Sequence, residues 1–120
     1  MRLIEMSENI TLREQMNQRV APVVLVNRFT VKPEEAEQLL TAWKADAEVM
    51  KRQPGFISTQ MHRGVGDPGE FLNYAVWQSV ELFQRAFNNP EFRASLAAYP
   101  PSTTASPHLF QKISVPGICD

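Results

Sequence analysis

Apolar and polar residues alternate with two different periods along residues 23–115. A period near two, together with many β-branched and aromatic residues, predicts β-strands. The first such segment is apolar on both faces, which is typical of a central strand that is covered on both sides. The strand pattern occurs in four segments: 23–31, 56–63, 71–77 and 108–115.

A period near 3.6 predicts two helices. The first begins at Pro33, carries acidic residues in its first turn and basic residues in its last, and ends before Pro54–Gly55. The second begins after Ser79, a good N-cap, and is expected to kink or restart at Asn89–Pro90. The apolar stripe of the first helix consists of Ala36, Leu39, Leu40, Trp43, Ala47 and Met50.

The predicted elements follow one another in the order β-α-β-β-α-β. This order predicts a ferredoxin-like α+β sandwich, in which a four-stranded antiparallel sheet carries both helices on one face. Residues 1–21 are polar and weakly periodic, so we expect an appended N-terminal arm before a domain that spans residues 22–118. Residues 99–107 contain three prolines and predict a loop before the last strand.

The sheet face that points away from the helices is also apolar. Its expected residues on the first and third strands are Val24, Val26, Leu72, Tyr74 and Val76. An uncovered sheet face of this kind would form an exposed apolar patch. We therefore predict a homodimer in which two copies pack sheet against sheet.

The second and third strands are predicted to form a hairpin with a loop of several residues that is rich in Gly and Pro. If Arg63 pairs with Glu70 across this hairpin, as their opposite charges favour, His62 shares a face with Asn73 and Trp77. A bulge in the loop would turn His62 to the other face. Asn73 and Trp77 belong to one strand and stay together in either case.

Composition and charge argue against several classes of partner. The 120 residues have 43% hydrophobic content and a net charge of -1, so we expect one domain without a basic surface for nucleic acid. No apolar run could span a bilayer and Cys119 is the only cysteine, so we expect a cytoplasmic protein with no membrane contact and no internal disulfide.

His62 and His108 lie far apart without a local cluster of ligands, so no metal site is expected. The G-x-G-x-x-G pattern at residues 64–69 leads into a strand rather than a helix, so it does not predict a dinucleotide site.

Polar groups interrupt otherwise apolar strands at two positions. Asn27 and Asn73 each place a carboxamide in an apolar strand. A buried carboxamide without hydrogen-bond partners would lower the stability of the folded protein by roughly 1 to 3 kcal/mol. They are either satisfied structural amides or part of a binding site, and two of them on one face favour a site. The Trp77 indole N–H has the same requirement if it is buried. His62 is either a solvated surface residue or a catalytic one.

The chain resembles the antibiotic biosynthesis monooxygenase family of dimeric α+β barrels over about residues 22–115. This resemblance implies the fold and the dimer predicted above, but the family catalyses more than one reaction. It rests on the order and spacing of short motifs: the strand around Asn27, the helix start Pro33-Glu34-Glu35, Pro54-Gly55-Phe56, His62-Arg63 with Asp67-Pro68, and Val76-Trp77-Gln78-Ser79 followed by Phe83.

Two branches of this family match different residues. One branch degrades haem with an Asn on the first strand, a Trp, and a ligating His in the second helix. Asn27 matches the first of these, but Leu96 stands at the position of the His, so iron would lose its axial ligand. The other branch oxidises phenolic polyketides and quinols without a cofactor, using an Asn and a Trp four residues apart and a His. Asn73, Trp77 and His62 match that pattern.

The second branch also uses a Tyr and an Arg in its second helix, where this chain carries Phe83 and Ala97, and Arg93 is a candidate replacement one turn earlier. The resemblance thus implies a cofactor-independent monooxygenase that oxidises an electron-rich aromatic of the anthrone or quinol type with dioxygen. The alternatives are a non-catalytic module that binds a small aromatic molecule or dimerises, and a haem-binding or haem-degrading relative. The implied catalytic residues are Asn73, Trp77 and His62, and the implied substrate contacts are Asn27, Phe83, Phe87 and Arg93.

Overall fold

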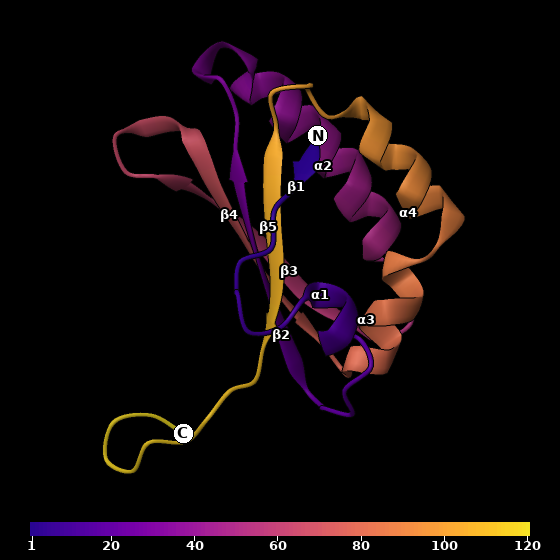
Figure 1. Cartoon of the computed structure of the whole chain (residues 1–120), viewed down its shortest axis with the longest axis vertical. Coiled ribbons are helices and arrows are strands. Elements are labelled where there is room, and N and C mark those ends of the chain that lie inside the picture. Colours follow the sequence, from indigo (N-terminus) through magenta and orange to yellow (C-terminus); the bar gives the residue numbers. More distant parts are fainter.

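A five-stranded mixed sheet with helices packed against one face forms the body of the protein (Figure 1). The computed structural model describes residues 1–120. Four strands run antiparallel to their neighbours, which confirms the ferredoxin-like sandwich, and β1 adds a short parallel strand at one edge. In the spatial order β1-β5-β2-β4-β3, the strands are β1 (Arg2–Leu3), β5 (Thr104–Phe110), β2 (Val23–Thr30), β4 (Asp67–Trp77) and β3 (Phe56–Gly64).

The helices begin where the capping residues predict. The Ser79 hydroxyl accepts a hydrogen bond from the backbone N–H of Leu82 at 3.1 Å, and the Asn89 side chain accepts one from Glu91 at 2.8 Å. None of the helices has the length and hydropathy that crossing a bilayer requires. The helices are α1 (Leu12–Gln15), α2 (Ala36–Met50), α3 (Val80–Phe87) and α4 (Pro90–Ser95), with 3-10 turns at Pro33–Glu35 and Leu96–Ala98.

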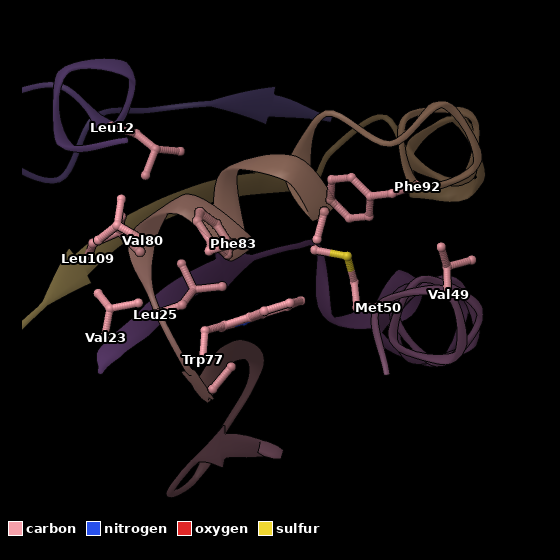
Figure 2. Packing of buried hydrophobic residues seen from close by; sticks show 12 residues of the cluster. Leu12, Val23, Leu25, Val49, Met50, Trp77, Val80, Phe83, Phe92 and Leu109 are labelled. Carbon is pink, nitrogen blue, oxygen red and sulfur yellow. The ribbon is translucent and has the colours of Figure 1, made fainter. Parts of the chain in front are cut away.

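Two clusters of buried side chains fill the space between the sheet and the helices. One contains Trp77 and Phe83 and is shown in Figure 2, and the other contains Phe29, Leu39 and Phe71. Each cluster takes alternate residues from the helix-facing side of the strands, as the period of two predicts. The clusters occupy opposite ends of β2 and β4, so the middle of the sheet lies between them.

Residues 1–21, predicted to be an arm, pack against the body. The backbone N–H of Arg2 donates to Thr103 and that of Ile4 donates to Ala105, which adds β1 to β5. Leu12 is buried in the same cluster as Trp77. The Gln15 side chain both donates to and accepts from the backbone of Leu109, at 2.8 and 2.9 Å. The first turn of helix therefore closes one end of the core.

The last strand has different bounds from those predicted. The structure places β5 at Thr104–Phe110 rather than at residues 108–115, and residues 111–120 leave the body as an exposed segment (Figure 1). Pro107 is tolerated inside β5 because the outer edge of this strand is paired with β1 only at Thr104 and Ala105. The proline-rich residues 99–107 were predicted to form a loop, but residues 104–107 belong to β5.

We expect Leu12→Ala to lower the free energy of unfolding by about 2 to 4 kcal/mol, because it removes a buried side chain and leaves a cavity. Leu3→Ala is a matched control, since Leu3 is 53% exposed, and it should change stability by less than about 0.5 kcal/mol. Urea unfolding followed by circular dichroism measures both. Equal effects of the two substitutions would contradict a structural role for α1.

Candidate functional site

A largely apolar cavity opens between the sheet and the helices where the two core clusters meet. It measures about 520 Å³, its open mouth included, and eleven of its sixteen lining residues are hydrophobic. β2, β3, β4 and β5 contribute to its floor, and α2, α3 and α4 form the walls above them. An apolar cavity with a few polar groups is typical of a small-molecule site. The polar side chains that line it are Asn27, Asp46, Thr59 and Asn73.

Asn27 and Asn73 face each other across neighbouring strands at the centre of this floor. They are direct partners in the register of β2 and β4, and both belong to the cavity lining. The Thr59 hydroxyl donates to Asn73 Oδ1 at 2.6 Å, which fixes the carboxamide and leaves its NH₂ group as a donor. Asn27 Oδ1 is buried and accepts no hydrogen bond from the protein. The Asn73 NH₂ group therefore remains as a donor, and Asn27 Oδ1 remains as an acceptor, among the groups that line the cavity.

Trp77 provides a second donor at the end of β4. Its side chain is 1% exposed and meets Phe56 and Phe83 edge to face, at centroid distances of 5.5 and 5.7 Å. Its indole Nε1–H has no hydrogen-bond partner in the protein. A buried donor without a partner costs about 1 to 3 kcal/mol, so its presence in a cavity wall requires an explanation.

A row of aromatic rings forms the wall above Trp77. Phe83 contacts Phe87 at 5.7 Å, and Phe87 contacts Phe92 at 5.6 Å. Figure 2 shows Trp77, Phe83, Phe92 and Met50 around a common space. These rings restrict access of water to the two unpaired polar atoms and present flat apolar surfaces to an aromatic ligand.

Asp46 is a site residue that the sequence interpretation missed. It lies on α2, lines the cavity, and accepts a hydrogen bond from the Tyr99 hydroxyl at 2.7 Å. Burial raises the pKa of the Asp46 carboxyl from 3.8 to about 6, although the bond from Tyr99 lowers it in part. A signal was present in the sequence, because Asp46 falls three residues after Trp43 and four before Met50, on the apolar stripe of its helix.

This set of groups can bind a flat aromatic molecule that carries oxygen atoms at its edges. Asn73 and Trp77 can donate hydrogen bonds to a carbonyl or an oxyanion, and Asn27 can accept one from a hydroxyl. The chain has no group of three or more His, Cys, Asp or Glu side chains that could hold a metal ion. The cavity thus offers hydrogen bonds, one carboxylate and aromatic surfaces.

Comparison with known proteins identifies the family of the chain. The family model described as antibiotic biosynthesis monooxygenase matches residues 22–98, which include both asparagines, Asp46 and Trp77. The chain belongs to the antibiotic biosynthesis monooxygenase family. Membership confirms the resemblance inferred from the sequence motifs.

Individual proteins resemble the chain in sequence or in fold. Deoxynogalonate monooxygenase of Streptomyces nogalater is 33% identical over 88 residues, which cover 73% of this chain and 74% of the relative. The crystal structure of SnoaB, a cofactor-independent oxygenase from the same organism, matches with a TM-score of 0.70 and 29% identity, over 82% of this chain and 99% of that one. Rv0793 from Mycobacterium tuberculosis is 15% identical with a TM-score of 0.66, over 81% of this chain and 100% of that one, and shares the fold. The first two relatives agree with the prediction that the chain is a monooxygenase, and Rv0793 supports the fold alone.

The predicted placement of His62 in the monooxygenase cavity was wrong. His62 pairs with Leu72 rather than Phe71, its side chain is exposed, and its Nδ1 lies 3.1 Å from the carbonyl oxygen of Leu72. The hairpin closes through the two residues Val65 and Gly66. Beyond this turn β4 contains three extra residues, 68–70, before Phe71. Arg63 therefore pairs with Phe71 rather than with Glu70, and the register differs by one residue from the predicted one. A shift of one residue turns the side chain to the other face of the sheet.

Arg93 does not line the cavity either. Its guanidinium lies over the outer face of Phe87, 4.5 Å from the ring centroid, and donates to the Asn88 side chain at 3.0 Å. Asn27, Asn73, Trp77, Phe83 and Phe87 are brought together on the cavity as the sequence predicts. Their roles in binding and catalysis remain predictions.

Asp46 should make the stability of the protein depend on pH. Because its pKa is raised in the folded state, the folded protein binds an extra proton between about pH 4 and pH 6, and the free energy of unfolding falls as pH rises through this window. Asp46→Asn should remove this contribution, which amounts to at most roughly 3 kcal/mol, and so stabilise the protein at pH 7 to 8. Urea unfolding at several pH values measures the difference.

Glu48→Gln is the matched control for this experiment, because Glu48 is an exposed carboxylate on the same helix. It should leave the pH dependence of unfolding unchanged. The interpretation of Asp46 is contradicted if the Asp46→Asn and wild-type curves run parallel from pH 4 to pH 8.

Proposed function

We propose that the chain is a cofactor-independent monooxygenase that oxidises an electron-rich aromatic of the anthrone or hydroquinone type with dioxygen. The observation that carries the proposal is the pair of buried polar atoms, Trp77 Nε1 and Asn27 Oδ1, that have no protein partner and belong to residues of one aromatic cavity. One is a donor and the other an acceptor, which fits a ligand with both a carbonyl and a hydroxyl group. The similarity to deoxynogalonate monooxygenase and to the cofactor-independent oxygenase SnoaB supports the same reaction class.

The substrate itself can supply the electrons in this reaction. An anthrone loses a proton from its ring methylene, and the resulting anion donates an electron to dioxygen. Oxygen then adds at the same carbon, and loss of water leaves a ketone, so that one methylene and one dioxygen give one carbonyl and one water. The protein must bind the ring, stabilise negative charge on its oxygen atoms and exclude solvent.

Asn73 and Trp77 are suited to the stabilisation of that charge. The Asn73 NH₂ is held in place by Thr59, and the Trp77 indole is held by the rings of Phe56 and Phe83. Donors that are fixed before the reaction stabilise an oxyanion more than mobile ones, because they need no reorganisation. The apolar surroundings strengthen these hydrogen bonds further.

Asn27 and the phenylalanines of α3 are proposed to bind the substrate. Asn27 Oδ1 would accept a hydrogen bond from a ring hydroxyl, which pairs a buried acceptor that otherwise has no partner. Phe83 and Phe87 would pack against the ring and limit the access of water to its anion. Haem is a poorer fit, because no histidine or cysteine lines the cavity and Leu96 packs against the core.

Oxygen uptake separates an enzyme from a module that only binds a small aromatic molecule. The enzyme should consume dioxygen in proportion to the loss of an anthrone or hydroquinone from a test panel. A non-catalytic module would bind members of the same panel, as seen by quenching of tryptophan fluorescence, without oxygen uptake. A stoichiometric haem complex with a sharp Soret band would instead favour the haem branch of the family.

Asn73→Ala and Trp77→Phe should each lower kcat by roughly 10²-fold with the best substrate of the panel, the order found for the loss of one oxyanion donor. The affinity for the ring should change far less, because Trp77→Phe keeps most of the aromatic packing and removes chiefly the N–H. Steady-state oxygen uptake measures kcat, and the binding of the quinone product serves as the control. Wild-type rates in both folded variants would contradict the assignment of these donors.

We also propose that two copies of the chain associate through the open face of the sheet. Leu72 is 37% exposed, Tyr74 is 43% exposed and Phe110 is 43% exposed on that face. Val24 and Val26 lie beside them and are half-buried. A second copy is the simplest cover for an apolar patch of this kind.

Tyr74→Asp should therefore weaken association by at least about tenfold, because it places a charge within the apolar interface. Ala45→Asp adds the same charge to an exposed position on α2 and is the matched control. Sedimentation velocity over a range of concentrations measures both dissociation constants. A wild-type protein that stays monomeric at micromolar concentration would contradict the sheet-to-sheet dimer.

A further inference from the structure

Asp46 is the only ionisable side chain that lines the cavity. All other lining residues carry aromatic, aliphatic, thioether, amide, hydroxyl or proline side chains. The proposed reaction begins with removal of a proton from the substrate, so it needs a proton acceptor within reach of the ring. His62, the residue expected to fill this role, lies on the other face of the sheet.

The carboxylate of Asp46 is held by one oxygen and free at the other. The Tyr99 hydroxyl donates to Oδ2 at 2.7 Å, and the Tyr99 ring stacks on Phe29 with an interplanar angle of 8°. Burial and the neighbouring carboxylate raise the pKa of Tyr99, so its hydroxyl remains a donor. Asp46 lines the cavity, and its Oδ1 accepts no hydrogen bond from the protein and is not fully buried. Tyr99 therefore fixes the carboxylate through Oδ2 and leaves Oδ1 available as a proton acceptor.

The position of Asp46 complements that of the two donors. Asp46 extends from α2, whereas Asn73 and Trp77 extend from β4 in the floor of the same cavity. An anthrone carries its acidic methylene and its carbonyl on opposite sides of the central ring. A ring bound between helix and sheet can thus place the methylene near the carboxylate while its carbonyl accepts hydrogen bonds from β4.

We propose that Asp46 is the catalytic base that removes the substrate proton, a proposal that rests on the monooxygenase function proposed above. Oδ1 takes a methylene proton, and the electrons of the C–H bond remain on the substrate as an enolate. The enolate transfers one electron to dioxygen, and the radical and superoxide combine to form a C–O bond. Protonated Asp46 returns its proton to the peroxide. Loss of the second methylene proton with cleavage of the O–O bond gives the ketone, and the departing hydroxide takes that proton to form water.

The acidity of Asp46 suits this role. With a pKa of about 6, the carboxyl group is largely ionised at pH 7 and is a stronger base than an ordinary aspartate. Tyr99 is the ionisable group that faces the Asp46 carboxylate. The residues that β2, β3, β4, β5, α3 and α4 contribute to the cavity are uncharged, and Lys44 and Glu48 of α2 are exposed.

The first test measures oxygen uptake with 1,8-dihydroxyanthrone as a function of pH. Wild-type kcat/KM should rise to a plateau with an apparent pKa near 6, and Asp46→Asn should lower kcat by at least about 10²-fold and abolish the rise. Tyr99→Phe keeps the stacked ring but removes the hydrogen bond, so the apparent pKa should move upward, which a purely structural role would not produce. Glu48→Gln and His62→Gln should retain the wild-type profile.

The second test follows proton removal without oxygen chemistry. In anaerobic D₂O, the wild-type protein should accelerate exchange of the methylene protons of the same anthrone, as measured by ¹H NMR, and Asp46→Asn should slow this exchange by a similar factor. Exchange without oxygen uptake in air would overturn the monooxygenase function but support Asp46 as a base. Oxygen uptake with equal exchange by wild type and Asp46→Asn would overturn the role of Asp46 and leave the function intact. Neither activity in the wild type would overturn both.

Discussion

The pairing of Asn27 with Asn73 in the middle of the sheet is the constraint on which the site depends. On β2 and β4 the neighbouring helix-facing residues are apolar and belong to one core cluster or the other. A carboxamide cannot join an apolar cluster without a hydrogen-bond partner. Two carboxamides side by side therefore separate the clusters, and the cavity forms at this separation. The Thr59 hydroxyl satisfies one of the two amide oxygens and leaves the rest of this polar pair directed at the cavity.

Three groups that are unfavourable for folding lie at this cavity, while two further buried atoms without partners, Thr103 Oγ1 and His108 Nδ1, lie elsewhere. Trp77 Nε1 and Asn27 Oδ1 are buried without partners, and Asp46 carries a carboxylate in apolar surroundings that raise its pKa. Each is unfavourable for folding by itself, with typical losses of about 1 to 3 kcal/mol for an unpaired polar group. A protein selected only for stability would replace them with apolar side chains or provide partners. Their convergence on one space is the physical argument for function, because local loss of stability is characteristic of binding and catalytic sites.

Much of the fold followed from the sequence, because it depends on local signals. Apolar periods and the caps at Ser79 and Asn89 predicted the order of elements, and the common strand of Asn73 and Trp77 placed them together without knowledge of the register. His62 could not be placed in this way, because its orientation depends on the irregular pairing between Gly64 and Phe71. Asp46 was missed for a different reason. An acidic residue on an amphipathic helix is normally read as solvent-exposed, and its position on the apolar stripe became meaningful only once the cavity was seen.

The low polarity of the cavity links the proposed base to the proposed donors. Burial disfavours the ionised form of Asp46, which raises its pKa and makes it a better proton acceptor. The same surroundings strengthen the hydrogen bonds that Asn73 and Trp77 can make to the anion that forms when the proton leaves. A bound aromatic ring would displace remaining water and increase both effects, so binding would itself promote proton removal. Since the anion then reacts directly with dioxygen, a small domain can catalyse an oxidation with one carboxylate, two fixed donors and an aromatic wall.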